Sequence, residues 1–312
     1  MARFPGKNTF AFTVFDDTDG STLENVGPVY RCLSDLGFRT TKSVWPLPLV
    51  TEHTSGGSTG CTLEDREYLK FVRQLQDEGF EIALHGVRND DSTRDVVERG
   101  LRAFCDRLGR YPRTHTNHYR NRDNLYWGTS RLATAAGRAA CWAWSCLKRT
   151  TLYEGHVESS PYFWGDICKQ YIQYVRNFTV DEINITRVNP TLPYHDSTKP
   201  LVNFWFTSSE GANIVSFCDR INEPSQDRLE AEGGICIMYS HFAEGFSERG
   251  IVNPRFKSLL RRLSRKNGWF VPVAELLDFL RTTRTEDNIQ RPELASLERR
   301  WLKYKLRYPR SR

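Results

Sequence analysis

Short apolar runs alternate with longer segments of helical apolar spacing along most of the chain. The first run is Phe10–Phe15, and further β-like runs lie at residues 38–44, 81–84, 111–117, 141–147, 201–206, 235–239 and 269–272. Segments 62–78 and 92–108 begin with helix-capping residues and are each followed directly by a glycine. Strands that alternate with helices of this length predict right-handed βαβ crossovers and a parallel sheet or barrel.

The number of strands favours one domain. About seven strands over roughly 280 residues fit a single α/β barrel better than two separate domains. We therefore expect a barrel over residues 1–281, followed by a basic helical tail over residues 282–312.

The positive charge of the chain is concentrated at its end. Residues 281–312 hold ten Lys and Arg against four Asp and Glu, and this excess equals the formal net charge of +6 of the whole chain. Such a tail binds anionic lipid or an anionic polymer in some proteins and is a solvated helix face in others. We favour the solvated face, expect no nucleic-acid partner, and keep open a peripheral membrane or other anionic contact.

The composition is that of an ordinary globular protein, with 39% hydrophobic and 26% charged residues. No run approaches the roughly 20 apolar residues that span a bilayer. The N-terminal residues lead into the first strand without an apolar leader, so we expect no secretory signal and a cytoplasmic location. The eight cysteines include no Cys-x-x-Cys pair and are expected to be reduced thiols.

Three carboxylates, Asp16, Asp17 and Asp19, directly follow the first strand. Ligands and catalytic groups of α/β folds collect at the carboxyl ends of strands. Clustered carboxylates repel one another, so they usually need a cation or a shared proton. We favour a functional cluster over an exposed acidic turn, because the residues just before the acids are nearly all apolar.

Histidines follow three later strands in the same way, at His85, His118 and His241. Imidazoles and carboxylates that reach one barrel face from separate strands are what a divalent metal site needs. Any one of these histidines alone would more often be a structural residue. Together with the acids they predict a metal site.

These residues resemble the motifs of the polysaccharide deacetylases. The first motif, an apolar strand followed by an Asp-Asp pair, is matched by Thr13-Val-Phe-Asp16-Asp17. Gly79-Phe-Glu-Ile-Ala-Leu-His85 resembles the second motif, and Ile237-Met-Tyr-Ser-His241 the last. The segment from Gly268 resembles the closing strand and helix, so the resemblance covers roughly residues 8–281. It implies a distorted (β/α)7-type barrel.

The resemblance also implies roles for the matched residues. Asp16 would be the catalytic base, Asp17 and His85 metal ligands, and His241 the general acid. A divalent metal, most simply zinc, with cobalt, nickel or manganese as alternatives, would polarise an N-acyl carbonyl. The substrate would be an amino sugar or oligosaccharide, and the absent leader suggests a precursor of a surface polysaccharide such as O-antigen or capsule.

The chain departs from the family pattern at the second metal histidine, where it has Asn89. Asn is a poor zinc ligand, so another group has to complete the set. His118 is the best candidate and His115 is the fallback. Candidates for substrate contact lie nearby or at another strand end, at Asn117, Arg120 and Trp144.

Two other functions remain open. Asp17-Thr-Asp19-Gly-Ser21 matches the start of haloacid-dehalogenase-type phosphatases, in which Asp17 would be the nucleophile and Asp19 the acid or base. This hypothesis leaves His85 and His241 without a role. The other possibility is a non-catalytic sugar-binding protein that kept the barrel and lost the metal, which Asn89 favours.

Overall fold

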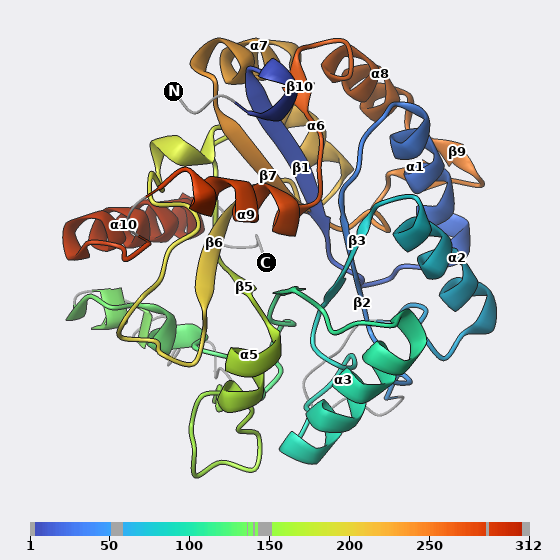
Figure 1. The fold of residues 1–312 in the computed structure, drawn as a ribbon. Helices are drawn as coiled ribbons and strands as arrows, with labels where there is room; N and C mark the ends of the chain where they lie inside the picture. The colour runs from blue at the N-terminus through green and yellow to red at the C-terminus, as the bar shows by residue number, and fades with distance from the viewer. Residues whose placement is uncertain are drawn as a thin grey trace.

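The computed structural model describes residues 4–50, 59–135, 137–139, 141–142, 152–284 and 287–307. Seven parallel strands form a closed barrel in chain order, because the last strand pairs with the first (Figure 1). The strands are β1 (Phe10–Asp16), β2 (Thr41–Val44), β3 (Glu81–Leu84), β4 (Thr114–His115), β5 (Tyr174–Val180), β6 (Phe204–Glu210) and β7 (Ile235–Ser240). The predicted α/β barrel is confirmed.

The barrel is distorted where β1 meets β2. These strands pair only at the carboxyl end of β1, where Asp16 lies opposite Lys42. At the other end of β1, Phe10 and Ala11 pair with the short strand β10 (Gly268–Trp269). The gap between β1 and β2 is thus closed by the last strand of the chain.

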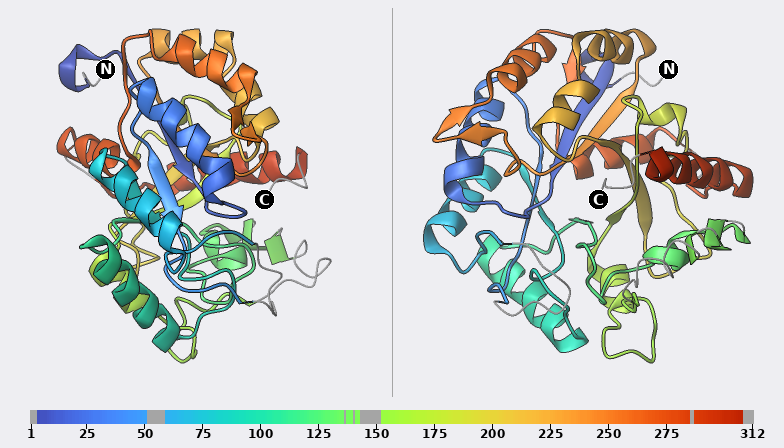
Figure 2. Two further views of the ribbon diagram at one scale, coloured as in Figure 1. Left: turned by 90° about the vertical axis from the view of Figure 1, so that its right-hand side faces the viewer. Right: turned by 180° about the vertical axis from the view of Figure 1, so that it is seen from behind.

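Helices surround the barrel on its outside (Figures 1 and 2). Their bounds are α1 (Leu23–Asp35), α2 (Arg66–Asp77), α3 (Arg94–Leu108), α5 (Gly165–Tyr171), α6 (Ile214–Arg220), α7 (Glu223–Glu232), α8 (Pro254–Leu263), α9 (Val273–Thr282) and α10 (Arg291–Arg307). Three short 3-10 helices, η1 (Pro5–Lys7), η2 (Gly128–Arg131) and η3 (Ile185–Arg187), and a hairpin of β8 (Ser247–Glu248) and β9 (Ile251–Val252) complete the described elements. Each outer helix buries one apolar face, as α2 does with Tyr68, Val72 and Leu75.

Side chains of β1 alternate between two cores. Phe12 and Val14 belong to the core between the strands and the outer helices. Ala11 and Phe15 belong to the core inside the barrel. Because successive side chains of a strand point to opposite faces, Asp16 faces the helices and the next side chain faces the barrel interior.

Helix α9 closes the end of the barrel opposite the carboxyl ends of the strands. Its apolar residues, among them Leu276 and Leu277, join the interior core. The amide of Val273 donates to Oγ1 of Thr41 at 2.9 Å, at the start of β2. Among the described elements, α9 therefore covers the barrel end opposite the one where the predicted site residues lie.

The chain after the barrel forms α10, whose inner face packs on β5. Leu294, Leu297 and Trp301 of this helix are buried in the outer core. Glu298, also buried, accepts hydrogen bonds from the amide of Ala133 and from Thr134. The expected solvated face is limited to the outer side, where Arg299 and Lys303 are exposed.

Three segments differ from the sequence expectation. Residues 141–142 are helical rather than the start of a strand, and residues 143–147 lie outside the described part of the chain. Strand β5 was not predicted, because Arg176 and Asn177 interrupt its apolar pattern. The strand expected at residues 201–206 begins and ends later, as β6.

Among the described residues, no helix is long and apolar enough to cross a membrane. None of the seven described cysteines forms a disulfide.

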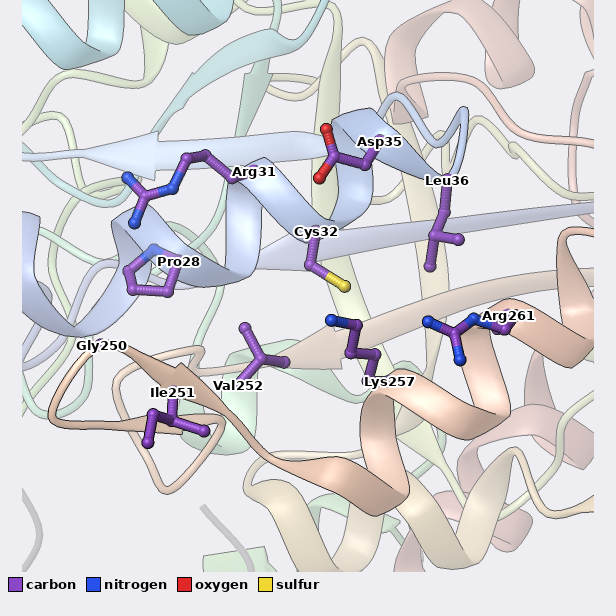
Figure 3. Close-up of a pocket in the computed structure, with 10 residues that line it drawn as sticks. All are labelled: Pro28, Arg31, Cys32, Asp35, Leu36, Gly250, Ile251, Val252, Lys257 and Arg261. Atoms are coloured by element: carbon purple, nitrogen blue, oxygen red, sulfur yellow. The ribbon is translucent and has the colours of Figure 1, made fainter.

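A surface cavity of about 530 Å³ lies between α1, the β8–β9 hairpin and α8, on the helix side of the barrel (Figure 3). Its lining includes Arg31, Lys257 and Arg261 and none of the predicted site residues.

Candidate metal centre

The loop after β1 is held by backbone hydrogen bonds on both sides. The amide of Asp17 donates to the carbonyl of Ser240 at 2.8 Å, and that of Gly20 donates to the carbonyl of Thr59 at 2.7 Å. The amide of Ser21 turns back to the carbonyl of Thr18 at 2.9 Å. Gly20 has a φ of +67°, a left-handed conformation that favours glycine. This tight loop brings Asp19 to the mouth of the barrel.

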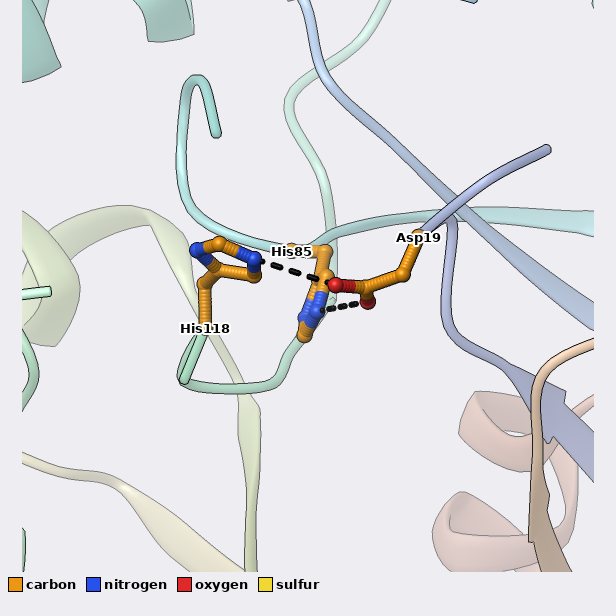
Figure 4. Close-up of side chains that lie close together, drawn as sticks. All are labelled: Asp19, His85 and His118. Carbon is orange, nitrogen blue, oxygen red and sulfur yellow. Dashed lines mark hydrogen bonds and ion pairs between the residues drawn. The ribbon is translucent and has the colours of Figure 1, made fainter. Parts of the chain in front are cut away.

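Asp19 lies between two imidazoles that follow other strands. Nε2 of His85, after β3, is 2.8 Å from Oδ2 of Asp19, and Nε2 of His118 is 3.1 Å from Oδ1 (Figure 4). All three side chains are buried. Their ligand atoms lie within 4.8 Å of one another, which makes this group a candidate metal site.

The imidazoles are oriented by bonds to their far nitrogens. Nδ1 of His85 lies 3.3 Å from the carbonyl oxygen of Thr116, and Nδ1 of His118 lies 2.9 Å from Oδ1 of Asn121. Because an oxygen of this kind only accepts, each Nδ1 carries the hydrogen, and each Nε2 can present a lone pair to Asp19. Lone pairs that face a carboxylate need a proton or a cation between them. The donor set therefore fits a divalent metal.

His241, after β7, is a third imidazole arranged in this way. Its Nδ1 bonds the carbonyl of Ala212 at 3.1 Å, and its Nε2 is 3.6 Å from Oδ2 of Asp19. Although burial lowers the pKa of His241, Asp19 and Asp17 raise it to about 9. Asp19 likewise raises the pKa of His118, while the histidines hold the pKa of Asp19 well below its usual value against the effect of burial.

Asp17 also faces this space, but its carboxylate is bound by a guanidinium. Nη1 and Nη2 of Arg176, on β5, donate to its two oxygens at 2.9 and 2.6 Å. Oδ2 of Asp17 is 3.9 Å from Nε2 of His85. Burial raises the pKa of Asp17, but Arg176 and then His85 outweigh it, so that the pKa is lowered. Asp17 also forms a second candidate metal group with Asp19 and His241, while its carboxylate is paired with Arg176.

Asp16 lies on the other face of β1. Its Oδ2 is 3.0 Å from Nζ of Lys42 and accepts from the hydroxyl of Tyr30 at 3.0 Å. Its Oδ1 accepts from the amide of Phe242 at 2.7 Å. The side chains of Asp16 and Lys42 are both 0% exposed, so this carboxylate does not contact bulk solvent. The structure separates Asp16 from the group around Asp19.

No protein-family model and no curated protein matches the chain. Among solved structures, it is similar to a protein from Mycobacterium smegmatis provisionally assigned as a polysaccharide deacetylase, at 11% identity and a TM-score of 0.53, over 93% of this chain and 97% of that one. It is also similar to the Puue allantoinase, at 12% identity and a TM-score of 0.50, over 90% and 93% of the two chains. The chain has the fold of the polysaccharide deacetylases. The resemblance predicted from the motifs is confirmed for the fold, and the chemistry rests on the residues of this chain.

Two residues considered as metal ligands in this deacetylase fold lie away from Asp19. Both side-chain ends of Asn89 bond the backbone of Val50, which fastens the segment after β2. His115 packs edge-on against Trp164 in the outer core, and burial lowers its pKa to about 3. Of the candidate third ligands, the structure brings only His118 to the histidine that follows β3.

The predicted substrate contacts have mixed positions in the deacetylase fold. The side chain of Asn117 bonds the amide and the carbonyl of Leu125, so its polar atoms are engaged within a loop. Arg120 is exposed at the rim and lies 4.9 Å from the ring of Tyr119. Trp144 lies outside the described residues.

Sequence reasoning missed two charged residues, Arg176 and Lys42. Each is the single basic residue of a strand in the structure, β2 or β5, and each is buried beside an aspartate of β1 or its loop. A lone cation in a buried strand needs a counter-charge. A lone basic residue between β-forming residues was therefore the sequence signal that could have identified Arg176 and Lys42.

Proposed function

We propose that this protein is a metal-dependent hydrolase that removes an N-acyl group from an amino sugar. The observation that carries the proposal is the convergence of histidine Nε2 atoms on Asp19, each with its Nδ1 engaged elsewhere. Asp19, His85 and His118 would hold the ion. Nitrogen and oxygen donors suit zinc best, with cobalt, nickel and manganese as alternatives. The bound ion supplies a polarised acyl oxygen and a water of lowered pKa.

We assign the general-base role to Asp17 rather than to Asp16. Asp17 lies beside the candidate metal site, and its two bonds to Arg176 orient the carboxylate and keep it ionised. A base must lie within hydrogen-bond reach of the proton that it takes. The enclosed position of Asp16 does not offer that reach.

His241 would be the general acid. With Nδ1 bonded to Ala212, its Nε2 faces the site, and in the metal-free protein Asp19 and Asp17 raise the pKa of His241 to about 9 against the effect of burial. As water adds to the acyl carbon and the C–N bond breaks, Asp17 takes a proton from the water and His241 gives one to the departing nitrogen. The products are a carboxylic acid and a free amine.

The nature of the substrate is supported less directly. A structural neighbour is provisionally assigned as a polysaccharide deacetylase, and the rim carries the exposed Tyr119 with Arg120 beside it. We propose an amino sugar or oligosaccharide of surface polysaccharide biosynthesis, handled in the cytoplasm. The exposed Arg299 and Lys303 of α10 would serve a peripheral membrane or other anionic contact.

The two alternatives are less well supported. A phosphatase would need Asp19 as an open acid or base, but this carboxylate is enclosed by histidines. A non-catalytic sugar-binding protein would be expected to lack a set of metal ligands. In this structure His118 completes such a set with Asp19 and His85, although Asn89 replaces the second metal histidine of the family pattern. The deacetylase hypothesis uses all of these residues.

The test is hydrolysis by protein stripped with a chelator and reloaded with zinc or cobalt. The panel would contain N-acetylated amino sugars and oligosaccharides, allantoin and a phosphomonoester. We expect release of acetate and free amine that is lost on stripping and restored by metal, and Asp19→Asn should need a higher metal concentration for the same recovery. Release of phosphate, or equal amide hydrolysis without metal, would contradict the proposal.

A further inference from the structure

A fully buried ion pair lies on the helix side of β1, behind the candidate metal centre. Nζ of Lys42 is 3.0 Å from Oδ2 of Asp16, and both side chains are 0% exposed. The two residues also lie opposite each other in the β1–β2 ladder. Burying two charges carries a large desolvation cost, which a pair offsets only when its geometry is good and its remaining bonding positions are filled.

The partners of this pair lie at two places in the frame of the site. Nζ of Lys42 donates to Oγ of Ser21 at 3.1 Å, at the end of the loop that carries Asp17 and Asp19. Oδ1 of Asp16 accepts from the amide of Phe242, the residue that follows His241. The pair therefore ties both ends of the acidic loop to the residue next to the proposed general acid.

A second set of bonds fixes the pair itself. The hydroxyl of Tyr30, on α1, donates to Asp16, and Oγ of Ser43 donates to the Asp16 carbonyl at 3.0 Å. Although burial lowers the pKa of Lys42, Asp16 raises it above its usual value, so Lys42 stays charged. The carboxylate thus has partners on both oxygens before any substrate arrives.

We infer that Asp16 and Lys42 are a positioning pair that holds Asp17, Asp19 and His241 in the geometry of the site, and that Asp16 transfers no proton. The roles of those three residues rest on the function proposed above. Asp17 is the neighbour of Asp16 on the opposite face of the strand, so a shift of one carboxylate moves the other. Metal and catalytic groups must be held within about 0.5 Å of their working geometry.

The test compares Asp16→Asn, Lys42→Met and the double variant. Either single change leaves a buried group without its counter-charge, whereas the double change removes both charges. Lys199→Met is the matched control, since Lys199 forms another buried ion pair with Asp196, and the bonds of that Asp196 side chain stay within residues 196–199. The measurements are zinc affinity against a competing chelator, the visible spectrum of the cobalt-loaded protein, and kcat separately from KM.

We expect each single variant to bind zinc about 10- to 100-fold more weakly, as for other residues that support metal ligands. The cobalt spectrum should change, kcat should fall more than KM rises, and the double variant should recover most of both losses. Lys199→Met should lower stability without moving zinc affinity or the spectrum. An unchanged zinc affinity and spectrum in Lys42→Met would overturn the inference.

The double variant also decides the matter if the single variants do not fold. If it binds zinc with a normal cobalt spectrum but has lost about 10³-fold or more in kcat, Asp16 acts in the chemistry and the inference is wrong. If it retains turnover within about tenfold, Asp16 transfers no proton, as the inference requires. A wild-type protein that hydrolyses nothing in the panel would reject the proposed function, while the zinc and cobalt measurements would still test the pair.

Discussion

The three aspartates of the first loop should respond differently when each is neutralised. Asp19→Asn keeps the shape of the side chain but removes the charge that faces the Nε2 atoms of His85 and His118, 2.8 and 3.1 Å away. Asp17→Asn, two residues earlier, removes a charge whose two oxygens are bound by Arg176. The two substitutions are chemically identical and separate the ligand role from the base role.

The expected size of the effect follows from the number of ligands. Binding of structural zinc by four protein ligands is worth about 10–16 kcal/mol, or roughly 2.5–4 kcal/mol per ligand. Weakening one of the three ligands should therefore reduce zinc affinity by about 10²- to 10³-fold. Asp17→Asn should leave zinc affinity within about tenfold and lower kcat by about 10²- to 10⁴-fold, the usual contribution of a general base.

The assay is competition with a chromophoric chelator, followed by turnover at saturating metal. Turnover at saturating metal separates a loss of affinity from a loss of chemistry, because Asp19→Asn can still be loaded. The opposite ranking, with zinc lost in Asp17→Asn and kept in Asp19→Asn, would restore the ligand set that the family resemblance implies and refute ours.

Three further predictions concern stability. Arg176→Met should lower the free energy of unfolding by about 3–5 kcal/mol, since it strands the buried carboxylate of Asp17, and Arg176→Lys should lose less; chemical denaturation measures both. In metal-free protein, His241 has a pKa of about 9 against about 6.5 when unfolded, so its stabilising contribution should be complete below about pH 6.5 and disappear as the pH rises through 9. His241→Gln should flatten that part of a denaturation series measured in chelator from pH 6 to 10. Glu298→Ala should cost about 2–3 kcal/mol by leaving the donors of Thr134 unpaired, and should speed amide exchange in α10 more than in β1 if the helix undocks first.

Much of the fold was predictable because its signals are local. Each of β1, β3 and β7 is a largely apolar run that ends at or just before a charged or polar residue, and the intervening helices carry capping residues and terminal glycines. The histidines at the strand ends, His85 and His241, were found for the same reason. Strand β5 was missed because it contains Arg176, a charged residue inside the barrel. The charge of Arg176 is balanced by Asp17, which directly follows β1.

The division of work among the acids depends on information that the sequence pattern does not contain. All seven residues of β1 are buried, so hydrophobicity does not tell which face of this strand is the barrel interior. Only barrel closure decides that Phe15 faces inward, and with it that Asp16 faces the helices. Once that face is known, strand geometry requires that adjacent acids separate and that Asp17 point inward, while the turn at Gly20 decides where Asp19 goes. An Asp-Asp pair matched by motif therefore predicts a site at this strand end, and the long-range partners Lys42 and Arg176 show which of the two carboxylates faces the group around Asp19.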